Sequence, residues 1–430
     1  MDLPDPIAPE DRPGEAIGWP ALWSVFGRIG LLSFGGPAAQ IALMHRELVE
    51  RRPWLTEDAF RRALGFCMLL PGPEAMQLAT YCGWRLRGTP GALLAGGLFV
   101  IPGAAAIFAL VFLYLAYGTL PAVQAAFLGI KAAVVVIVVE ALVRVGRRAL
   151  GDRATRFVAA LAFLAIFALD APFPLILAAA GAWGALRGGA TASDPVAPPR
   201  ASARATVRTV ATWGAIWLAP LLALSALGAE RLAAIGWFFA KLAVLTFGGA
   251  YAVLAWMAQD VVEAKAWLTP EQMIDALGLA ETTPGPLILV TQFVGALAAG
   301  PGAWGLLAGG LVALHATFAP CFLWILAGAP WLDSLTSRPR LAGALAGVTA
   351  AVAGIIANLC LWFALHVLFA RVGRLEAGPL DMAWPDPSSF DPVAAGLTLL
   401  AVPVVALSRL PLAAALAMMA LAGWAAAALA

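Results

Sequence analysis

The chain has 430 residues, of which 62% are hydrophobic and only 12% are charged, and its mean hydropathy is +0.87. A soluble domain is about 45–50% apolar and about 25% charged, so this composition excludes a water-soluble fold and predicts a polytopic membrane protein. The formal net charge of +2 says nothing about partners by itself. The expected partner is the lipid bilayer, and no nucleic-acid partner is expected.

Apolar runs between charged or Pro/Gly-rich breaks define thirteen segments, most of them close to the roughly 20 residues that span a bilayer as a helix. They cover about 21–43, 61–84, 91–117, 121–143, 156–169, 172–186, 209–228, 233–257, 274–298, 303–329, 341–370, 392–407 and 410–429. The polar stretch 187–208 is predicted to link two halves, and a second, acidic and Pro-rich interruption covers 371–391.

One unusual pattern occurs twice in the chain. The motif Leu-Ser-Phe-Gly-Gly at 32–36 returns 213 residues later as Leu-Thr-Phe-Gly-Gly at 245–249, and Pro71-Gly72-Pro73 returns as Pro284-Gly285-Pro286. The offset is constant throughout 26–98, so no insertion separates the copies. An internal duplication built around helix-breaking residues in apolar surroundings predicts a secondary transporter.

The duplicated segments are the first to third and the eighth to tenth, so the copies lie seven segments apart. Because seven is odd, the copies have opposite orientations if every segment spans, which is the inverted-repeat plan of many transporters. Basic loops are expected on the cytoplasmic side. If every segment spans, the basic loop at 144–156 and the linker at 187–208 lie on the cytoplasmic side, as this rule expects. The same alternation places the basic loop 44–60 outside and its counterpart 258–273 inside, which conflicts with the rule.

Re-entrant hairpins would remove that conflict. If the four Gly-Gly and Pro-Gly-Pro segments dip into the membrane and return, the chain has four hairpins and nine spans, with its amino terminus inside and its carboxyl terminus outside. The alternative is thirteen spans with a local violation of the charge rule. Both hypotheses keep the two copies inverted.

The helix-breaking residues carry the predicted chemistry. A proline ends a helix, and inside a bilayer such a break survives only where it faces protein or a water-filled cavity. The broken segment then offers the N–H groups and positive dipole end of a half-helix to an anion, and glycine lets the ligand approach the backbone. The predicted substrate-binding residues at the breaks are Gly35, Gly36, Pro71, Gly72, Pro73, Gly248, Gly249, Thr282, Thr283, Pro284, Gly285 and Pro286. A helix kink or a close helix contact is the structural alternative.

Ionisable residues inside apolar segments are costly and usually functional. Arg28 and Lys241 are repeat counterparts just upstream of the two Phe-Gly-Gly motifs, and we expect them to bind the anion, with snorkelling to the interface as the alternative. Further candidates for a relay or gate are Glu74, Gln77, Lys131, Glu140, Glu281 and Gln292. Lys131 and Glu140 could form an ion pair, a proton relay or part of the path, and pairing across helices is favoured.

No cofactor, metal site or enzymatic activity is expected. The sequence has no G-x-x-x-x-G-K-[ST] phosphate-binding loop, so ATP is not the energy source within this chain. The four cysteines lie singly in apolar segments without metal-type spacing. A membrane-embedded enzyme or scaffold would need a polar catalytic cluster or a binding domain, and the sequence shows neither. The sequence is compatible with a homodimer.

Taken together, the motifs resemble the chromate ion transporter (CHR) family in its long-chain, two-domain form. In the first half the resemblance rests on Phe34-Gly35-Gly36-Pro37-Ala38-Ala39-Gln40, Leu70-Pro71-Gly72-Pro73-Glu74-Ala75 and Phe99-Val100-Ile101-Pro102-Gly103. In the second half it rests on Thr246-Phe247-Gly248-Gly249-Ala250-Tyr251, Glu281-Thr282-Thr283-Pro284-Gly285-Pro286 and Gln292-Phe293-Val294-Gly295. Ala250 stands where the first half has Pro37, so the two breaks are not expected to have equal roles.

The sequence thus predicts an all-α membrane protein with two homologous halves, which the odd segment offset places in inverted topology. Residues 1–186 would form an N-terminal CHR repeat, 187–208 a cytoplasmic linker, and 209–430 a C-terminal CHR repeat that begins with a connecting helix at 209–228. The function that the resemblance implies is export of chromate across the cytoplasmic (inner) membrane of a bacterium, driven by membrane potential or ion coupling. The alternative is a transporter of sulfate or another inorganic anion for which chromate is a mimic.

Overall fold

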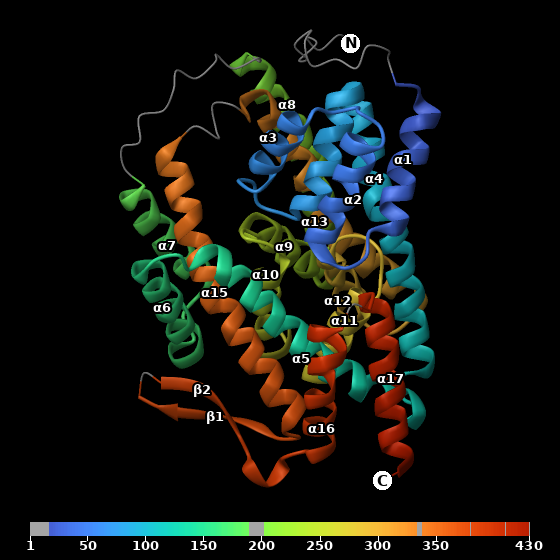
Figure 1. Ribbon diagram of the computed structural model, residues 1–430, viewed down its shortest axis with the longest axis vertical. Helices are drawn as coiled ribbons and strands as arrows, with labels where there is room; N and C mark the ends of the chain where they lie inside the picture. Colours follow the sequence, from blue (N-terminus) through green and yellow to red (C-terminus); the bar gives the residue numbers. More distant parts are fainter. Residues whose placement is uncertain (1–16, 189–201, 333–337, 379, 409, 430) are drawn as a thin grey trace. The chain divides into compact units, whose positions relative to one another are not determined.

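The structure, a computed structural model, describes residues 17–188, 202–332, 338–378, 380–408 and 410–429. Within these ranges the chain forms helices and one two-stranded antiparallel sheet (Figure 1). The elements of the first half are α1 (Trp19–Leu32), α2 (Gly36–His45), η2 (Arg46–Glu50), α3 (Glu57–Cys67), α4 (Glu74–Tyr117), α5 (Pro121–Ala149), α6 (Arg153–Leu169) and α7 (Phe173–Arg187). Those of the second half are α8 (Ala203–Ala226), α9 (Glu230–Leu245), α10 (Ala250–Gln259), η3 (Asp260–Ala264), α11 (Pro270–Glu281), η4 (Leu287–Leu289), α12 (Val290–Ala298), α13 (Ala303–Gly328), η5 (Ala329–Trp331), α15 (Pro339–Leu368), β1 (Val372–Ala377), β2 (Leu380–Pro385), η6 (Pro387–Ser389), α16 (Pro392–Ala401), η7 (Val402–Leu407) and α17 (Leu412–Leu429).

The duplicated sequence forms a duplicated series of elements. α1, α2, η2 and α3 recur in the same order as α9, α10, η3 and α11, and in both copies a ten-residue helix ends in one π-helical turn. A threonine then starts the next helix: Oγ1 of Thr56 accepts a hydrogen bond from the N–H of Ala59, and Oγ1 of Thr269 accepts one from Gln272, each at 3.2 Å. Such N-caps satisfy an N–H of the first turn that has no partner within the helix. Each threonine ends a Trp-Leu-Thr motif, at 54–56 and again at 267–269, so this repeated motif precedes a helix in both copies.

Six helices among the described residues are long and apolar enough to cross a membrane: α4, α5, α8, Ala303–Trp331, α15 and α17. Three apolar helices are shorter: Phe173–Arg187, Leu287–Ala298 and Pro392–Leu407. The protein is thus a predominantly helical membrane protein, and the repeated segments are broken where glycine and proline predicted breaks. The number of thirteen segments stays a prediction.

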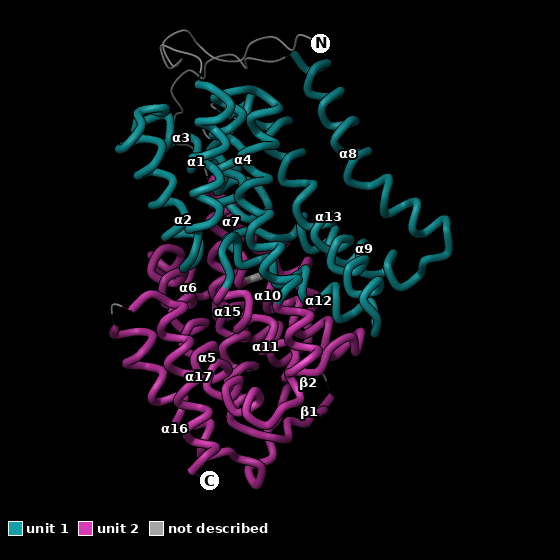
Figure 2. Tube along the Cα trace, turned by 90° about the vertical axis from the view of Figure 1, so that its right-hand side faces the viewer, with its two compact units in different colours: residues 1–109, 190–249, 283–341 teal, residues 110–189, 250–282, 342–430 magenta. Residues whose placement is uncertain are grey.

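The chain divides into two compact units, coloured separately in Figure 2. Unit 1 comprises residues 1–109, 190–249 and 283–341, and unit 2 comprises residues 110–189, 250–282 and 342–430. Each unit therefore combines stretches from both halves of the sequence.

Two of the broken segments in unit 1 fold back on themselves. Nε of Arg28 on α1 lies 3.9 Å from Oε1 of Glu47 on η2, although a continuous helix would place residues 19 apart at about 28 Å. The rings of Phe66 on α3 and Tyr81 on α4 have centroids 6.0 Å apart, where a continuous helix would separate them by about 22 Å. The chain therefore reverses direction at both breaks of the first repeat.

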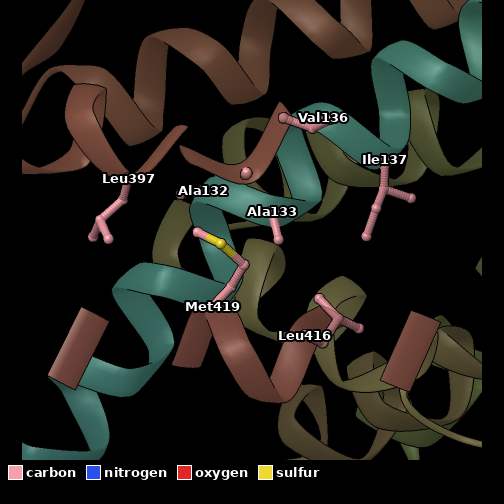
Figure 3. Close-up of a cluster of buried hydrophobic side chains, with 8 residues drawn as sticks. Ala132, Ala133, Val136, Ile137, Leu397, Leu416 and Met419 are labelled. Atoms are coloured by element: carbon pink, nitrogen blue, oxygen red, sulfur yellow. The ribbon is translucent and has the colours of Figure 1, made fainter. Parts of the chain in front are cut away.

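Small residues bring the helices of unit 2 into close contact. A Cβ added to Gly129 on α5 would lie 1.8 Å from the carbonyl oxygen of Met419 on α17, and one added to Gly423 would lie 2.3 Å from that of Ala125. Around this contact α5, α16 and α17 bury the side chains shown in Figure 3, which belong to the cluster Ala132, Ala133, Val136, Ile137, Leu397, Ala401, Leu416 and Met419. Lipid tails are as apolar as these side chains, so packing rather than hydrophobicity holds such helices together.

The Gly129 contact gives a stability prediction. Gly129→Ala forces the α5 and α17 backbones apart, and we expect it to cost about 1–3 kcal/mol of unfolding free energy, the usual range for overpacking. Gly146→Ala on the same helix is the matched control, because its Cβ would meet only Leu150 Cδ1 at 3.6 Å. Unfolding of the purified variants in detergent, followed by circular dichroism, measures the difference. Equal stability of the two variants would contradict the close contact.

A β-hairpin interrupts the predicted all-α architecture at 371–391, where the sequence predicted only a polar interruption. β1 and β2 pair in antiparallel register from Val372 opposite Pro385 to Ala377 opposite Leu380. Nη2 of Arg371 lies 2.7 Å from Oδ2 of Asp386 at the base of the hairpin. Hydrogen bonds from Ser388, with that guanidinium, hold the pKa of Asp386 below its usual range.

Candidate functional site

The two Gly-Gly breaks have the same local geometry. Oγ of Ser33 donates to the carbonyl of Ile29 at 2.5 Å, and Oγ1 of its counterpart Thr246 donates to Leu242 at 2.7 Å. The glycines that follow have positive φ values, +85° and +78° at Gly35–Gly36 and +74° and +101° at Gly248–Gly249. Residues other than glycine rarely adopt this backbone conformation, so the glycines allow the chain to end one helix and begin the next.

Unit 1 joins the two kinds of break crosswise between the repeats. The N–H of Gly72 donates to the carbonyl of Thr246 at 2.7 Å, and the N–H of Gly285 donates to the carbonyl of Ser33 at 2.9 Å. The two bonds are repeat counterparts of each other, since both donors and both acceptors are 213 residues apart. Each Pro-Gly-Pro is therefore held against the Gly-Gly break of the other repeat.

The two crossed bonds use the sole N–H group of each Pro-Gly-Pro. Proline has no N–H, so the glycine is the only backbone donor in the tripeptide. Gly72 and Gly285 are both buried, with φ values of +122° and +91°. Both N–H groups are already used in the crossed bonds. The start of α2 is therefore the source of hydrogen-bond donors for a ligand. Gly35 caps α2 without a side-chain hydrogen bond in the described residues, and Ala38 and Ala39 of its first turn are exposed.

Three buried glutamines support the breaks in unit 1. Nε2 of Gln40 donates to the carbonyl of Gly285 at 2.7 Å, Nε2 of Gln77 to Pro71 at 2.6 Å, and Nε2 of Gln292 to Ala104 at 2.9 Å. Their Oε1 atoms are buried without a hydrogen-bond partner in the described part of the chain. A buried carbonyl oxygen in that state suits a water molecule or a hydroxyl group. Our sequence analysis singled out Gln77 and Gln292 as candidates but did not assign a role to Gln40.

The predicted cations Arg28 and Lys241 have different surroundings. The guanidinium of Arg28 lies beside Glu47, as described above. Lys241 on α9 lines an apolar groove of about 310 Å³ that it shares with Trp217, Leu218 and Trp237, and it forms no ion pair with any described residue. An ammonium group on an apolar helix needs water or a counter-ion, so this groove is a candidate place for an anion.

Lys131 forms an ion pair across helices, and its partner is Asp275 rather than Glu140. Nζ of Lys131 on α5 lies 3.4 Å from Oδ1 of Asp275 on α11, and the hydroxyl of Tyr114 donates to Oδ2 at 2.9 Å. Asp275 is buried, and our sequence analysis missed it. The signal was available, because it is a carboxylate at the start of the apolar segment 274–298.

Apart from Glu140, the remaining candidates lie at or next to the ends of broken helices. In unit 2, Glu281 is buried at the end of α11 and accepts a hydrogen bond from the Tyr251 hydroxyl at 2.6 Å, and Oγ1 of Thr282 donates to the carbonyl of Leu279. In unit 1, Glu74 is the first residue of α4, and its Oε1 lies 4.0 Å from where a Cβ on Gly249 would stand. Thr283, also in unit 1, is buried, whereas Glu140 in unit 2 is half-buried on α5.

The comparison with known proteins gives one consistent result. A family described as chromate transporter matches residues 20–185 and 233–424. A chromate transport protein of Pseudomonas aeruginosa is 36% identical over 84% of this chain and 85% of its own length, and one of Cupriavidus metallidurans is 34% identical over 77% and 79%. A probable chromate transport protein of Synechococcus elongatus is 31% identical over 78% and 82%.

No solved structure matches the chain. The family match spans both halves and includes both Gly-Gly breaks and both Pro-Gly-Pro breaks. With relatives above 30% identity over most of both chains, it confirms the resemblance that the motifs indicated. The chain therefore belongs to the chromate transporter family.

Proposed function

We propose that this protein exports chromate, a tetrahedral oxyanion, across the cytoplasmic membrane by alternating access. The observation that carries the proposal is the pair of crossed hydrogen bonds from Gly72 to Thr246 and from Gly285 to Ser33. They bring helix breaks from both repeats together in one unit, as expected for a site at a repeat interface. The names of the relatives supply the substrate class.

The Gly-Gly breaks are the part of the proposed path that binds the anion. Gly35 and Gly36 present backbone without side chains, and the exposed residues Ala38 and Ala39 place the N–H groups of the first turn of α2 at the positive end of its dipole. Gly248 and Gly249 repeat this backbone conformation, whereas the residue that follows is Ala250 instead of Pro37. The two ends would therefore hold the oxyanion unequally, which suits a path with a preferred direction.

Energy coupling is proposed to involve the buried carboxylates of unit 2. Glu281 bonds to Tyr251, and Asp275 lies between Lys131 and Tyr114. Buried ionisable groups inside membrane proteins commonly carry protons or hold a counter-ion. Either carboxylate could bind a proton in one state of the cycle, and coupling to the membrane potential alone would need neither.

The first repeat supports the hairpin hypothesis better than the alternative of thirteen spans. The reversals between Arg28 and Glu47 and between Phe66 and Tyr81 are those of segments that dip and return. In that arrangement the basic loop 44–60 lies in the cytoplasm, as the positive-inside rule requires.

Flux into sealed proteoliposomes tests the proposed function. We expect the purified protein to move chromate faster than protein-free vesicles do, and faster still when the receiving compartment is held at positive potential, because the substrate is an anion. Sulfate is measured in parallel, since it is also a tetrahedral oxyanion. Faster sulfate than chromate flux would assign sulfate as the natural cargo. Absence of flux for both anions would rule out the proposal.

A further inference from the structure

A buried carboxylate in unit 1 gathers three arginines. The Glu47 side chain on η2 is only 1% exposed, and its Oε1 and Oε2 accept hydrogen bonds from Nη1 of Arg51 at 2.7 Å and from Nη1 of Arg52 at 2.6 Å. Arg28 approaches the same carboxylate from α1 at 3.9 Å. The three guanidiniums and this carboxylate are called the Glu47 cluster below.

The Glu47 cluster has positive charge and hydrogen-bond donors in excess. Three guanidiniums surround one carboxylate, so two positive charges are not balanced within the cluster. Both carboxylate oxygens are used by Arg51 and Arg52, and Arg28 makes no hydrogen bond to any described residue. The arginine side chains are 39–51% exposed. Each guanidinium carries five N–H donors, most of which therefore face outward.

The second repeat does not gather three guanidiniums in this way. Asp260 is the counterpart of Glu47, and among the described residues it forms an ion pair with one base, Lys265, at 3.4 Å. The counterpart of Arg51 is Ala264. The second repeat keeps cations at the other two positions, Lys241 for Arg28 and Lys265 for Arg52, and it forms the same π-helical turn. Arg51 is therefore not needed to form the turn itself, and the set of three guanidiniums occurs in the first repeat.

We propose that the Glu47 cluster is a docking site for the oxyanion, at which Arg28 and the outward donors of Arg51 and Arg52 bind it before it reaches the breaks. Two unbalanced positive charges match a doubly charged tetrahedral anion, and guanidinium forks suit its oxygen atoms. Glu47 is a positioning residue that holds two of the guanidiniums in place. This inference rests on the proposed function. The headgroup of an anionic phospholipid offers the same chemistry, and vesicles with and without such a lipid separate the two sources.

Arg28→Gln is the primary test, because it removes a charge without breaking a hydrogen bond to Glu47. In phosphatidylcholine vesicles at low ionic strength we expect the KM for chromate to rise about fivefold or more, with kcat within about twofold, since the lost interaction acts on capture. Arg28→Lys should restore the KM. Arg61→Gln is the matched control, because Arg61 pairs with Asp58 and lies outside the cluster. Added salt should narrow the gap between Arg28→Gln and the unsubstituted protein.

A second variant guards against misfolding. Glu47→Gln/Arg51→Gln/Arg52→Gln removes the buried carboxylate together with its two partners, and it should also raise the KM for chromate. An unchanged KM in both variants would overturn the docking site while wild-type flux keeps the proposed function. A rise that appears only in vesicles containing anionic phosphatidylglycerol would assign the cluster to lipid phosphate and overturn the proposal. Absence of wild-type flux would instead contradict the proposed function.

Discussion

Gly72→Ala is expected to lower chromate flux by about tenfold or more, which corresponds to about 1.4 kcal/mol. Gly72 has a φ of +122°, and a Cβ there would stand 2.7 Å from Nε2 of Gln77 and 3.2 Å from Sγ of Cys321. A non-glycine residue in such a conformation costs about 1–3 kcal/mol, which the backbone can relieve by turning its N–H away from Thr246. Initial rates in proteoliposomes, normalised to the amount of inserted protein, measure the effect.

Gly285→Ala should act in the same direction through the other crossed bond. Its φ is +91°, and the added Cβ would meet Leu289 Cδ1 at 3.0 Å and the carbonyl oxygen of Phe99 at 3.4 Å. Gly27→Ala is the control, because it lies in α1 with nothing within 4 Å of the added Cβ. Wild-type flux in both Gly72→Ala and Gly285→Ala would show that the crossed bonds are not required for transport.

Lys131→Met is expected to destabilise the protein by about 3–5 kcal/mol, because it leaves the buried Asp275 carboxylate without its cation. Tyr114 still donates to Asp275, but one hydroxyl does not balance a charge. The free energy of unfolding of purified protein in detergent measures the loss.

The double variant Lys131→Met/Asp275→Asn separates the two meanings of this pair. Removing both charges should recover most of the stability, because neither side chain is then a lone buried ion. If transport also recovers, the pair is structural. If stability recovers but flux no longer depends on the pH gradient, Asp275 or Lys131 carries the coupled proton. Wild-type stability in Lys131→Met alone would contradict the buried ion pair.

The helix breaks of the repeats could be predicted from the sequence because they depend on local signals. Glycines that allow positive φ and prolines that lack an N–H act within a few residues, so the sequence predicted breaks near the ends of α1 and α9. The helix starts were placed less well, since the predicted segments 61–84 and 274–298 begin four residues after α3 and α11 do. The threonine N-caps that mark both starts, Thr56 and Thr269, were not recognised. Local rules of this kind need no knowledge of the tertiary fold.

The partners across the fold could not be predicted in the same way. The repeat identifies Gly72 with Gly285 and Ser33 with Thr246, but it does not show that each glycine bonds to the other copy. The sequence offers several carboxylates as possible partners of Lys131. Asp275 becomes the partner because α11 packs against α5 in the folded protein. The β-hairpin at 371–391 was not predicted, because its strands are short and contain charged residues, so the segment was interpreted only as a polar interruption.

In the proposed transport mechanism the two repeats present their breaks from opposite faces of the membrane. In a background with the four buried cysteines replaced by alanine, Arg51→Cys and Lys265→Cys are labelled in intact cells with a membrane-impermeant maleimide. We expect labelling from opposite sides, with position 265 reacting in intact cells and position 51 only after permeabilisation. Labelling of both positions from the same side would contradict it.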